Sequence, residues 1–202
     1  MLVIGLTGRA CAGKNQYASV FAEFGCAVVD VDLLGHQALE ESKQALVREF
    51  GAKVVESGEV NRKVLGSLVF SDPAKLRSLE RITHPVMVQA CKARIEEART
   101  EGAPALVLNA ALLSRMGLAA LCDQVLFIKA PLLVRYRRCA FREGLTLRRF
   151  LLRERAQKDI SIKTLGRKAG LQVLHNTGSK ALIHRQVATY CATIGISISP
   201  NG

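Results

Sequence analysis

The sequence contains no tryptophan, and only three Tyr and seven Phe occur among its 202 residues. So few aromatic side chains offer little surface for stacking nucleic-acid bases. No uninterrupted apolar run approaches the roughly 18 residues that a membrane-spanning helix needs. The opening segment MLVIGLTGRACAGK has neither a basic leader nor a small-residue cleavage site. We therefore expect no membrane span and no secretory signal.

Paired cysteine motifs are also missing, because the six cysteines lie far apart and none forms a CxxC pair. This spacing does not match a zinc site. In a chain of this length, such cysteines are typical of reduced, buried thiols, and we expect a cytoplasmic protein. Cys11 is an exception, because the positive field of a glycine-containing loop favours its thiolate form.

Charge of one sign is in excess: 29 Lys and Arg stand against 17 Asp and Glu, which gives a net charge of +12. The length, the 49% hydrophobic content and a mean hydropathy of +0.17 indicate one compact domain with a real core. Residues 129–168 alone carry a net charge of +10. Such a local, arginine-rich excess indicates a polyanionic partner, either a nucleic acid or small phosphorylated ligands.

Short apolar runs alternate with longer helical patterns along the whole chain. The five runs that read as strands are 2–6, 27–31, 105–108, 124–129 and 173–175, and a helical pattern follows each. The longest helical pattern begins at Asp72 and Pro73 and reaches about Thr100, and we expect Pro85 to bend or interrupt it. Repeated βα units predict an α/β fold, a parallel five-stranded sheet with helices on both faces.

The most distinctive motif follows the first expected strand. The segment Gly8-Arg9-Ala10-Cys11-Ala12-Gly13-Lys14 has the GxxxxGK pattern and precedes a helical pattern. Glycines let such a loop point its backbone N–H groups at phosphate oxygens, and the lysine and the helix N-terminus add positive charge. The pattern alone is weak evidence, and the alternative is an ordinary turn. Its placement between a strand and a helix favours nucleotide binding.

The next position departs from the phosphate-loop pattern. A Ser or Thr normally follows the lysine and gives its hydroxyl to Mg²⁺, whereas this chain has Asn15. We expect the phosphates, water and a nearby carboxylate to hold Mg²⁺, with Asn15 contributing through a water. Weakened metal binding is the alternative.

Two carboxylates, Asp30 and Asp32, follow the second apolar run. Side chains two residues apart on a strand share a face, and ligands of parallel sheets bind beyond the carboxyl ends of the strands. One carboxylate is therefore a candidate base for an attacking hydroxyl or a candidate Mg²⁺ ligand. The alternative is that one of them caps the helix expected from Leu33.

Read in order, these segments resemble dephospho-coenzyme A kinases. The resemblance rests on IGLTG, the GK at 13–14, VVDVD, NRKVLGSLVFSDPAKLRSLERITHP and a late arginine-rich stretch that ends in a Gln and an Asn-x-Gly. It runs from Ile4 to about Val187. The Arg62–Pro85 block is its most specific part, because other P-loop kinases do not share it.

The resemblance implies one P-loop kinase domain over 1–202, which transfers the γ-phosphoryl group of ATP, with Mg²⁺, to the 3′-hydroxyl of dephospho-coenzyme A. This reaction is the last step of coenzyme A synthesis. The family's regions would be a core at about 1–32, 103–131 and 171–202, a helical acceptor-binding region at about 33–102 and a basic lid at about 132–170. The partners are then small molecules rather than a nucleic acid. We expect a monomer, with a small homo-oligomer as the alternative.

Carried over residue by residue, the resemblance makes Asp32 the candidate base, with Lys14 and Arg142 as the cations at the transferred phosphoryl group. Asp30, Arg62 and His84 fall near the acceptor, although His84 alternatively bonds a backbone carbonyl at a kink. ATP would be held by Gly8, Arg9, Ala10, Cys11, Ala12, Gly13, Lys14, Asn15, Gln16, Arg138 and Asn176, with Gln157 also in the late segment. Further lid arginines are expected to form a solvated face: Arg135, Arg137, Arg148, Arg149 and Arg155.

Two more segments depart from the family. The family has Pro-Leu-Leu-Phe-Glu after its third strand, whereas this chain has Ala-Leu-Leu-Ser-Arg at residues 111–115. The family also has a late Ala-Asp, whereas this chain has Ala169-Gly170. Arg115 reverses a charge near the expected acceptor pocket. These changes leave two other hypotheses open: a P-loop kinase with a different nucleotide-like acceptor, and a catalytically weak protein that binds nucleotide or RNA through 129–168. A regulatory GTPase is disfavoured, because no Asn-Lys-x-Asp motif occurs.

Overall fold

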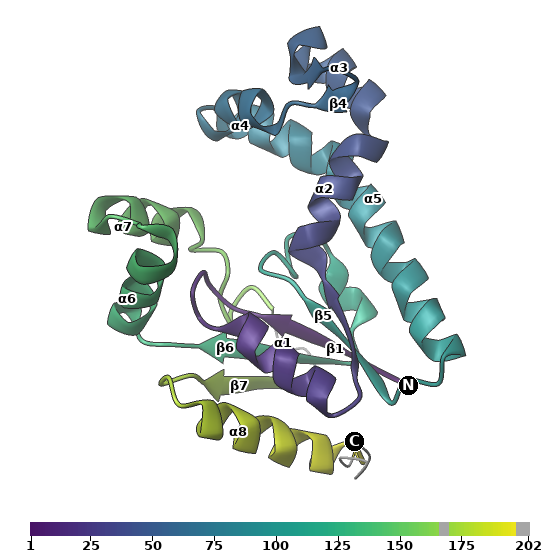
Figure 1. Cartoon of the computed structure of the whole chain (residues 1–202), viewed down its shortest axis with the longest axis vertical. Helices are drawn as coiled ribbons and strands as arrows, with labels where there is room; N and C mark the ends of the chain where they lie inside the picture. Colours follow the sequence, from purple (N-terminus) through teal and green to yellow (C-terminus); the bar gives the residue numbers. More distant parts are fainter. Residues whose placement is uncertain (166–169, 197–202) are drawn as a thin grey trace. The chain divides into compact units, whose positions relative to one another are not determined.

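Five strands form one parallel sheet in the computed structural model, which describes residues 1–165 and 170–196. They are β1 (Leu2–Thr7), β2 (Ala27–Asp30), β5 (Ala105–Asn109), β6 (Gln124–Lys129) and β7 (Leu171–His175). Their spatial order is β2-β5-β1-β6-β7, and every neighbouring pair is parallel (Figure 1). The predicted α/β fold with a five-stranded parallel sheet is confirmed.

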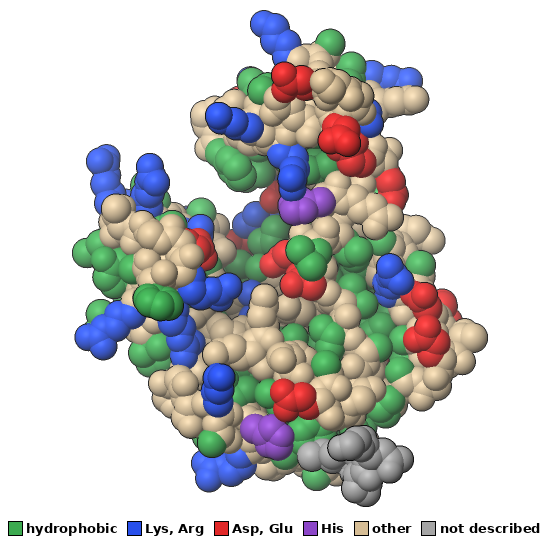
Figure 2. All heavy atoms as spheres, viewed as in Figure 1, with side chains coloured by type: hydrophobic (Ala, Val, Ile, Leu, Met, Phe, Trp, Pro, Cys, Tyr) green, Lys and Arg blue, Asp and Glu red, His purple; other side chains and the backbone are tan. Residues whose placement is uncertain are grey.

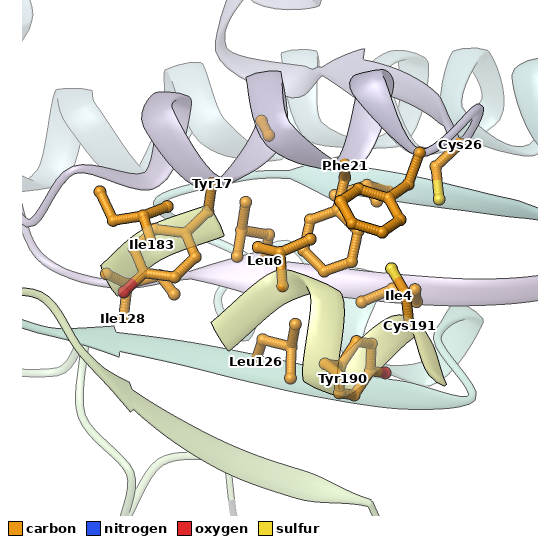
Figure 3. Close-up of a cluster of buried hydrophobic side chains, with 14 of the residues drawn as sticks. Ile4, Leu6, Tyr17, Phe21, Cys26, Leu126, Ile128, Ile183, Tyr190 and Cys191 are labelled. Carbon is orange, nitrogen blue, oxygen red and sulfur yellow. The ribbon is translucent and has the colours of Figure 1, made fainter. Parts of the chain in front are cut away.

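One face of the sheet is covered by α1 (Lys14–Glu23) and α8 (Lys180–Thr193). Figure 3 shows their apolar side chains meeting those of β1 and β6. Phe21 of α1 and Tyr190 of α8 form an edge-to-face pair, with ring centroids 5.8 Å apart. Burial of these side chains is the main force that fixes both helices on the sheet.

The opposite face meets the segment between β5 and β6. Side chains alternate along β1, and a Cβ at Gly5 would lie only 2.7 Å from Leu113 Cδ2, so this segment packs directly on the strand. The sequence predicted a helix here, which is wrong: residues 110–123 form turns and the short 3₁₀ helix η2 (Leu118–Leu121). Gly117, with φ of 73°, takes a left-handed conformation that interrupts any longer helix.

Two helices, α6 (Leu132–Glu143) and α7 (Leu147–Ala156), follow β6. Gly144, with φ of 60°, ends α6, and the Thr146 hydroxyl caps α7 by accepting the Arg149 N–H. Basic side chains project from this pair of helices (Figure 2). Arg135 corrects the expectation of a solvated face, because it is 5% exposed and pairs with Glu154. Arg137, Arg148, Arg149 and Arg155 are exposed, as predicted.

The chain divides into two compact units, one of residues 1–30 with the described residues from 94 onward, and one of 31–93. The second unit contains α2 (Val31–Glu41), α3 (Lys43–Phe50), η1 (Ala52–Val54), β3 (Val55–Glu56), β4 (Glu59–Val60), α4 (Arg62–Phe70) and most of α5 (Pro73–Thr100). Its own core consists of Leu46, Val54, Val60, Leu65 and Val69. The predicted long helix is confirmed, with Pro85 inside α5.

Within the described residues, every helix is too short or too polar to cross a bilayer. The expected lid and core segments at 166–169 and 197–202, including Ala169, lie outside the described residues.

Candidate nucleotide site

The loop between β1 and α1 has the backbone of a phosphate-binding loop. Gly8 and Gly13 both have positive φ, 153° and 97°, and Gly13 is the residue before the first turn of α1. A Cβ at Gly8 would lie 2.5 Å from the Ile128 carbonyl oxygen, and one at Gly13 would overlap the Asn176 amide. Only glycine fits at either position. The GxxxxGK spacing therefore reflects real steric limits of this loop.

Asn176, directly after β7, supports the loop from beneath. Its side chain is fully buried, donates to the Ala12 carbonyl over 2.9 Å and accepts from Arg138 over 3.0 Å. A further bond of 3.4 Å reaches the Gln16 side-chain oxygen. We call these contacts of Asn176 the core side of the loop. Asn176 was predicted to bind ATP, and its contacts position the loop residues.

Three residues of α7 and its C-terminal end meet the loop from the other direction. Arg9 donates to Glu154 over 3.2 Å and to the Ile160 carbonyl over 3.1 Å, and Glu154 also pairs with Arg135. Gln157 accepts the backbone N–H of Ala10 over 2.9 Å. We call the contacts of Glu154 and Gln157 with the loop, together with the disulfide between Cys11 and Cys139 of α6, the lid side. The Ala10 N–H is one of the groups that a phosphate would bind.

Burial and charge act in opposite directions on Glu154. Burial alone raises the pKa of its carboxyl group, but hydrogen bonds and positive charge from Arg135 and Arg9 outweigh burial, and the pKa ends below its usual value. The carboxylate is therefore the stable form. Arg135 has 7% and Glu154 has 10% of its side chain exposed, so this is a buried ion pair.

A cavity of about 800 Å³ opens beside the loop, between α1, α6 and α8. Gly13, Asn15 and Gln16 line it on one side, and Arg138 and Arg142 line it on another. Arg142 makes no ion pair within the described residues. Arg138 donates to the carbonyls of Cys11 and Ala12 over 3.4 and 3.3 Å, and burial lowers its pKa. The volume falls in the usual range of small-molecule sites.

Lys14 begins α1, and its ammonium group donates to the Gly8 carbonyl over 3.4 Å. This bond folds the side chain back along the loop. The cation therefore lies near the first glycine of the GxxxxGK segment, and its role toward phosphate stays a prediction.

The carboxyl edge of the sheet offers oxygen ligands suited to Mg²⁺. Asn109, at the end of β5, donates to Asn15 Oδ1 over 3.0 Å, and its own buried Oδ1 has no hydrogen-bond partner within the described residues. Asp30 is the register neighbour of Asn109 on β2. Mg²⁺ prefers oxygen ligands and keeps several waters. The amide oxygen of Asn109 and the carboxylate of Asp30 at the end of β2 therefore fit a hydrated Mg²⁺.

Asp32, Arg62 and His84 lie in the second unit. Asp32 is in the first turn of α2 and Arg62 is the first residue of α4, where Asn61 provides the cap. His84 lies in α5 next to Pro85. The expected strand geometry for Asp32 is wrong, because β2 ends at Asp30 and the helix begins at once. Asp32 therefore projects from a helix N-terminus, where a negative charge is favoured.

The cysteines also differ from expectation. Cys11 in the loop and Cys139 in α6 form a disulfide, while the remaining cysteines are buried thiols outside any disulfide, as the sequence predicted: Cys26, Cys91, Cys122 and Cys191. The Cys11 and Cys139 sulfurs and the Glu143 carboxylate lie within 4.8 Å of one another. While the disulfide exists, these sulfurs are not free to act as thiolate ligands.

Sequence reasoning missed two residues of this site. Asn109 was detectable as the one polar residue in the apolar run ALVLN, and Glu154 as an isolated acid among arginines. Arg115, which reverses a family charge, is held by Asp159 at 2.6 Å. Its positive charge is therefore largely compensated locally.

Comparisons with known proteins identify the family of this chain. Residues 2–181 match the family described as Dephospho-CoA kinase. A Dephospho-CoA kinase from Thermus thermophilus is 35% identical over 193 residues, which cover 96% of this chain and 92% of that protein.

Solved structures are also similar. The Thermus thermophilus protein TT1252 is 34% identical with a TM-score of 0.77, and the match covers 95% of this chain and 97% of that one. A shikimate kinase from Bacteroides thetaiotaomicron, at 15% identity, a TM-score of 0.56 and coverage of 96% and 98%, shares the fold alone. The chain thus belongs to the dephospho-CoA kinase family.

Proposed function

We propose that the protein transfers the γ-phosphoryl group of ATP to the 3′-hydroxyl of dephospho-coenzyme A, which yields coenzyme A and ADP. The observation that carries the proposal is the phosphate loop opening onto the 800 Å³ cavity lined by Arg138 and Arg142, in a chain of this family. The expectations of a monomer and of a cytoplasmic location stay predictions.

On the ATP side, the loop N–H groups and Lys14 bind the phosphates, and the 800 Å³ cavity receives the nucleotide. Phosphoryl transfer spreads negative charge over the non-bridging oxygens, so positioning and cations supply most of the catalysis. Arg142 is a suitable second cation, because it lines the cavity and its charge is not used by an ion pair within the described residues. Asn176 and Arg138 position the loop.

On the acceptor side, we assign the second unit to dephospho-coenzyme A. Asp32 accepts the proton of the attacking hydroxyl, and it lies in the first turn of α2, where the helix dipole favours a negative charge. Arg62, at the start of α4, and His84, in α5, are the proposed acceptor contacts. Residues 132–165 are the proposed lid.

Asn15, Asn109 and Asp30 would hold Mg²⁺ together with its waters and the ATP phosphates. Mg²⁺ would neutralise charge on the β- and γ-phosphates. Two amide oxygens are neutral ligands, so this chain relies on Asp30 for protein charge at the site.

The experiment incubates the protein with Mg-ATP and dephospho-coenzyme A and follows coenzyme A by mass and ADP release in parallel. Asp32→Asn should lower the rate by about 10²-fold or more, because it removes the base and keeps the size. Arg142→Ala should also slow the reaction, whereas Arg149→Ala on the exposed face of α7 should not. Unchanged activity of Asp32→Asn, or no product from the wild type, would overturn the proposal.

A further inference from the structure

The disulfide joins two segments that lie 128 residues apart in the chain, the phosphate loop and α6, with Cα atoms 5.8 Å apart. Its two ends differ in access. Cys11 is partly exposed, whereas Cys139 is fully buried. The four other described cysteines are buried and form no disulfide, so this bond is not part of a stabilising network of disulfides.

The bond fastens the loop to a continuous set of contacts. Next to Cys139, Arg138 bonds the Cys11 and Ala12 carbonyls, and one turn earlier Arg135 of α6 pairs with Glu154 of α7. Just after α7, the side-chain oxygen of Gln157 accepts a hydrogen bond from the backbone N–H of Ala10. A covalent link at Cys11 therefore holds α6, and through it α7, against the loop.

We propose that Cys11 and Cys139 form a redox modification site that controls nucleotide binding: the disulfide lowers the affinity for ATP, and reduction restores it. The inference rests on the proposed ATP site. Phosphate competes with Gln157 for the Ala10 N–H, and movement of α7 away from the loop would remove this competing contact. With the disulfide formed, α6 cannot leave Cys11, so the competing contact persists.

The oxidant is a low-molecular-weight disulfide. The Cys11 thiolate attacks one of its sulfurs, a mixed disulfide forms, and one small thiolate leaves. The Cys139 thiolate then attacks the Cys11 sulfur, the protein disulfide forms, and the second small thiolate leaves. Two protein thiols lose two protons and two electrons, and the small disulfide becomes two thiols. The exposure of Cys11 suits the first step, and the burial of Cys139 reserves it for the second.

The test compares the whole protein after treatment with dithiothreitol and after treatment with oxidised glutathione. Alkylation and peptide mass count the free thiols and locate the bond. Calorimetric titration with a non-hydrolysable ATP analogue then measures affinity, with no acceptor present. The oxidised form should bind about tenfold more weakly, the effect of one hydrogen bond to a charged group, and dithiothreitol should reverse the change.

The titrations include a metal chelator, with Mg²⁺ in excess over it, to keep thiophilic metal ions from the reduced cysteines. Once reduced, the sulfurs and the Glu143 carboxylate would otherwise offer a thiophilic cation a site.

Variants separate this effect from general oxidation. For each variant, the affinity after oxidation is divided by its own affinity after reduction. Cys139→Ser and Cys11→Ser should both give a ratio near one. Cys91→Ser, which removes a buried free thiol from α5, should keep the wild-type ratio.

Equal affinity of the two forms with the 11–139 bond present would overturn the inference. A persistent response in Cys139→Ser, failure of the bond to form, or failure of both forms to bind the analogue would also overturn it. The binding and thiol measurements need no acceptor. A redox response without coenzyme A formation therefore rejects only the acceptor assignment, whereas equal kinase rates and affinities reject only the redox control.

Discussion

The two sides of the phosphate loop are built from different chemistry. On the core side, the neutral amide of Asn176 is fully buried and bonds Ala12 and Arg138. On the lid side, Arg9 meets the charged Glu154, Ala10 meets Gln157, and Cys11 meets Cys139. The core-side contact of Asn176 with the loop uses a backbone carbonyl, which does not bind phosphate, whereas the lid-side contact of Gln157 occupies the Ala10 N–H, which we propose as a phosphate ligand. We therefore expect the core side to set the shape of the loop and the lid side to set how accessible the loop is to phosphate.

The largest effect on stability is expected from a substitution that removes a lid-side ion pair. Glu154→Gln leaves Arg135 buried without a counter-charge and should lower the free energy of unfolding by about 3 kcal/mol, measured by urea titration. Glu143→Gln is the matched control, because Glu143 and Arg153 are about one-third exposed and should contribute less than about 1 kcal/mol. Equal losses in the two variants would contradict a special role for the buried pair.

The next largest effect is expected from a substitution that removes the core-side contacts of Asn176. Asn176→Ala removes the buried amide that donates to the Ala12 carbonyl and accepts from Arg138, and should cost about 2 kcal/mol of unfolding free energy. It should also weaken ATP binding, because the loop loses its support. Gln172→Ala, on the exposed side of β7, is the control. A destabilised variant with normal ATP affinity would show that Asn176 does not shape the loop.

A pH titration sharpens the comparison further. The pKa of Glu154 is lower in the folded protein than its ordinary value of about 4.3, so its contribution to stability is complete above that value. The contribution is lost as pH falls through the lowered folded pKa. As pH falls below about 4.3, the unfolding free energy of Glu154→Gln should therefore fall less steeply than that of the wild type. Parallel pH curves would assign the acid sensitivity elsewhere.

The smallest expected effect is an increase in phosphate affinity and not a loss. Gln157→Ala frees the Ala10 N–H and should tighten binding of inorganic triphosphate to the reduced protein by about threefold to tenfold, measured by calorimetry. Inorganic triphosphate isolates the phosphate contacts from those of the base. Weaker binding would mean that Gln157 assists the phosphate and does not compete with it. Lys158→Ala, on the exposed surface, serves as the control.

The sheet was predictable because buried parallel strands are continuous apolar runs. The run predicted at 2–6 is β1 over Leu2–Thr7, and the run at 124–129 is β6 over the same residues. The phosphate loop was predictable because its glycines and lysine are local. The helix predicted after β5 failed, since apolar side chains that pack on the sheet need no regular helix to do so.

The remaining parts of the site depend on contacts between distant residues. Asn109 and Asn15 are 94 residues apart, and Cys11 and Cys139 are 128 apart. No local pattern indicates such pairs. Arg135 illustrates the same limit: it was expected to be solvated with its neighbours, but packing of α6 on α7 buries it with Glu154. A charge pattern therefore locates a basic segment without showing which of its charges are paired.

One competition experiment tests the central claim most directly. The reduced protein receives Mg-ATP with equal concentrations of dephospho-coenzyme A, AMP and shikimate, and mass spectrometry identifies the phosphorylated product. We expect coenzyme A to form in step with ADP, and the other two acceptors to stay unchanged. Phosphorylation of AMP or shikimate in preference to dephospho-coenzyme A, or ADP release with no phosphorylated acceptor, would contradict the proposed function.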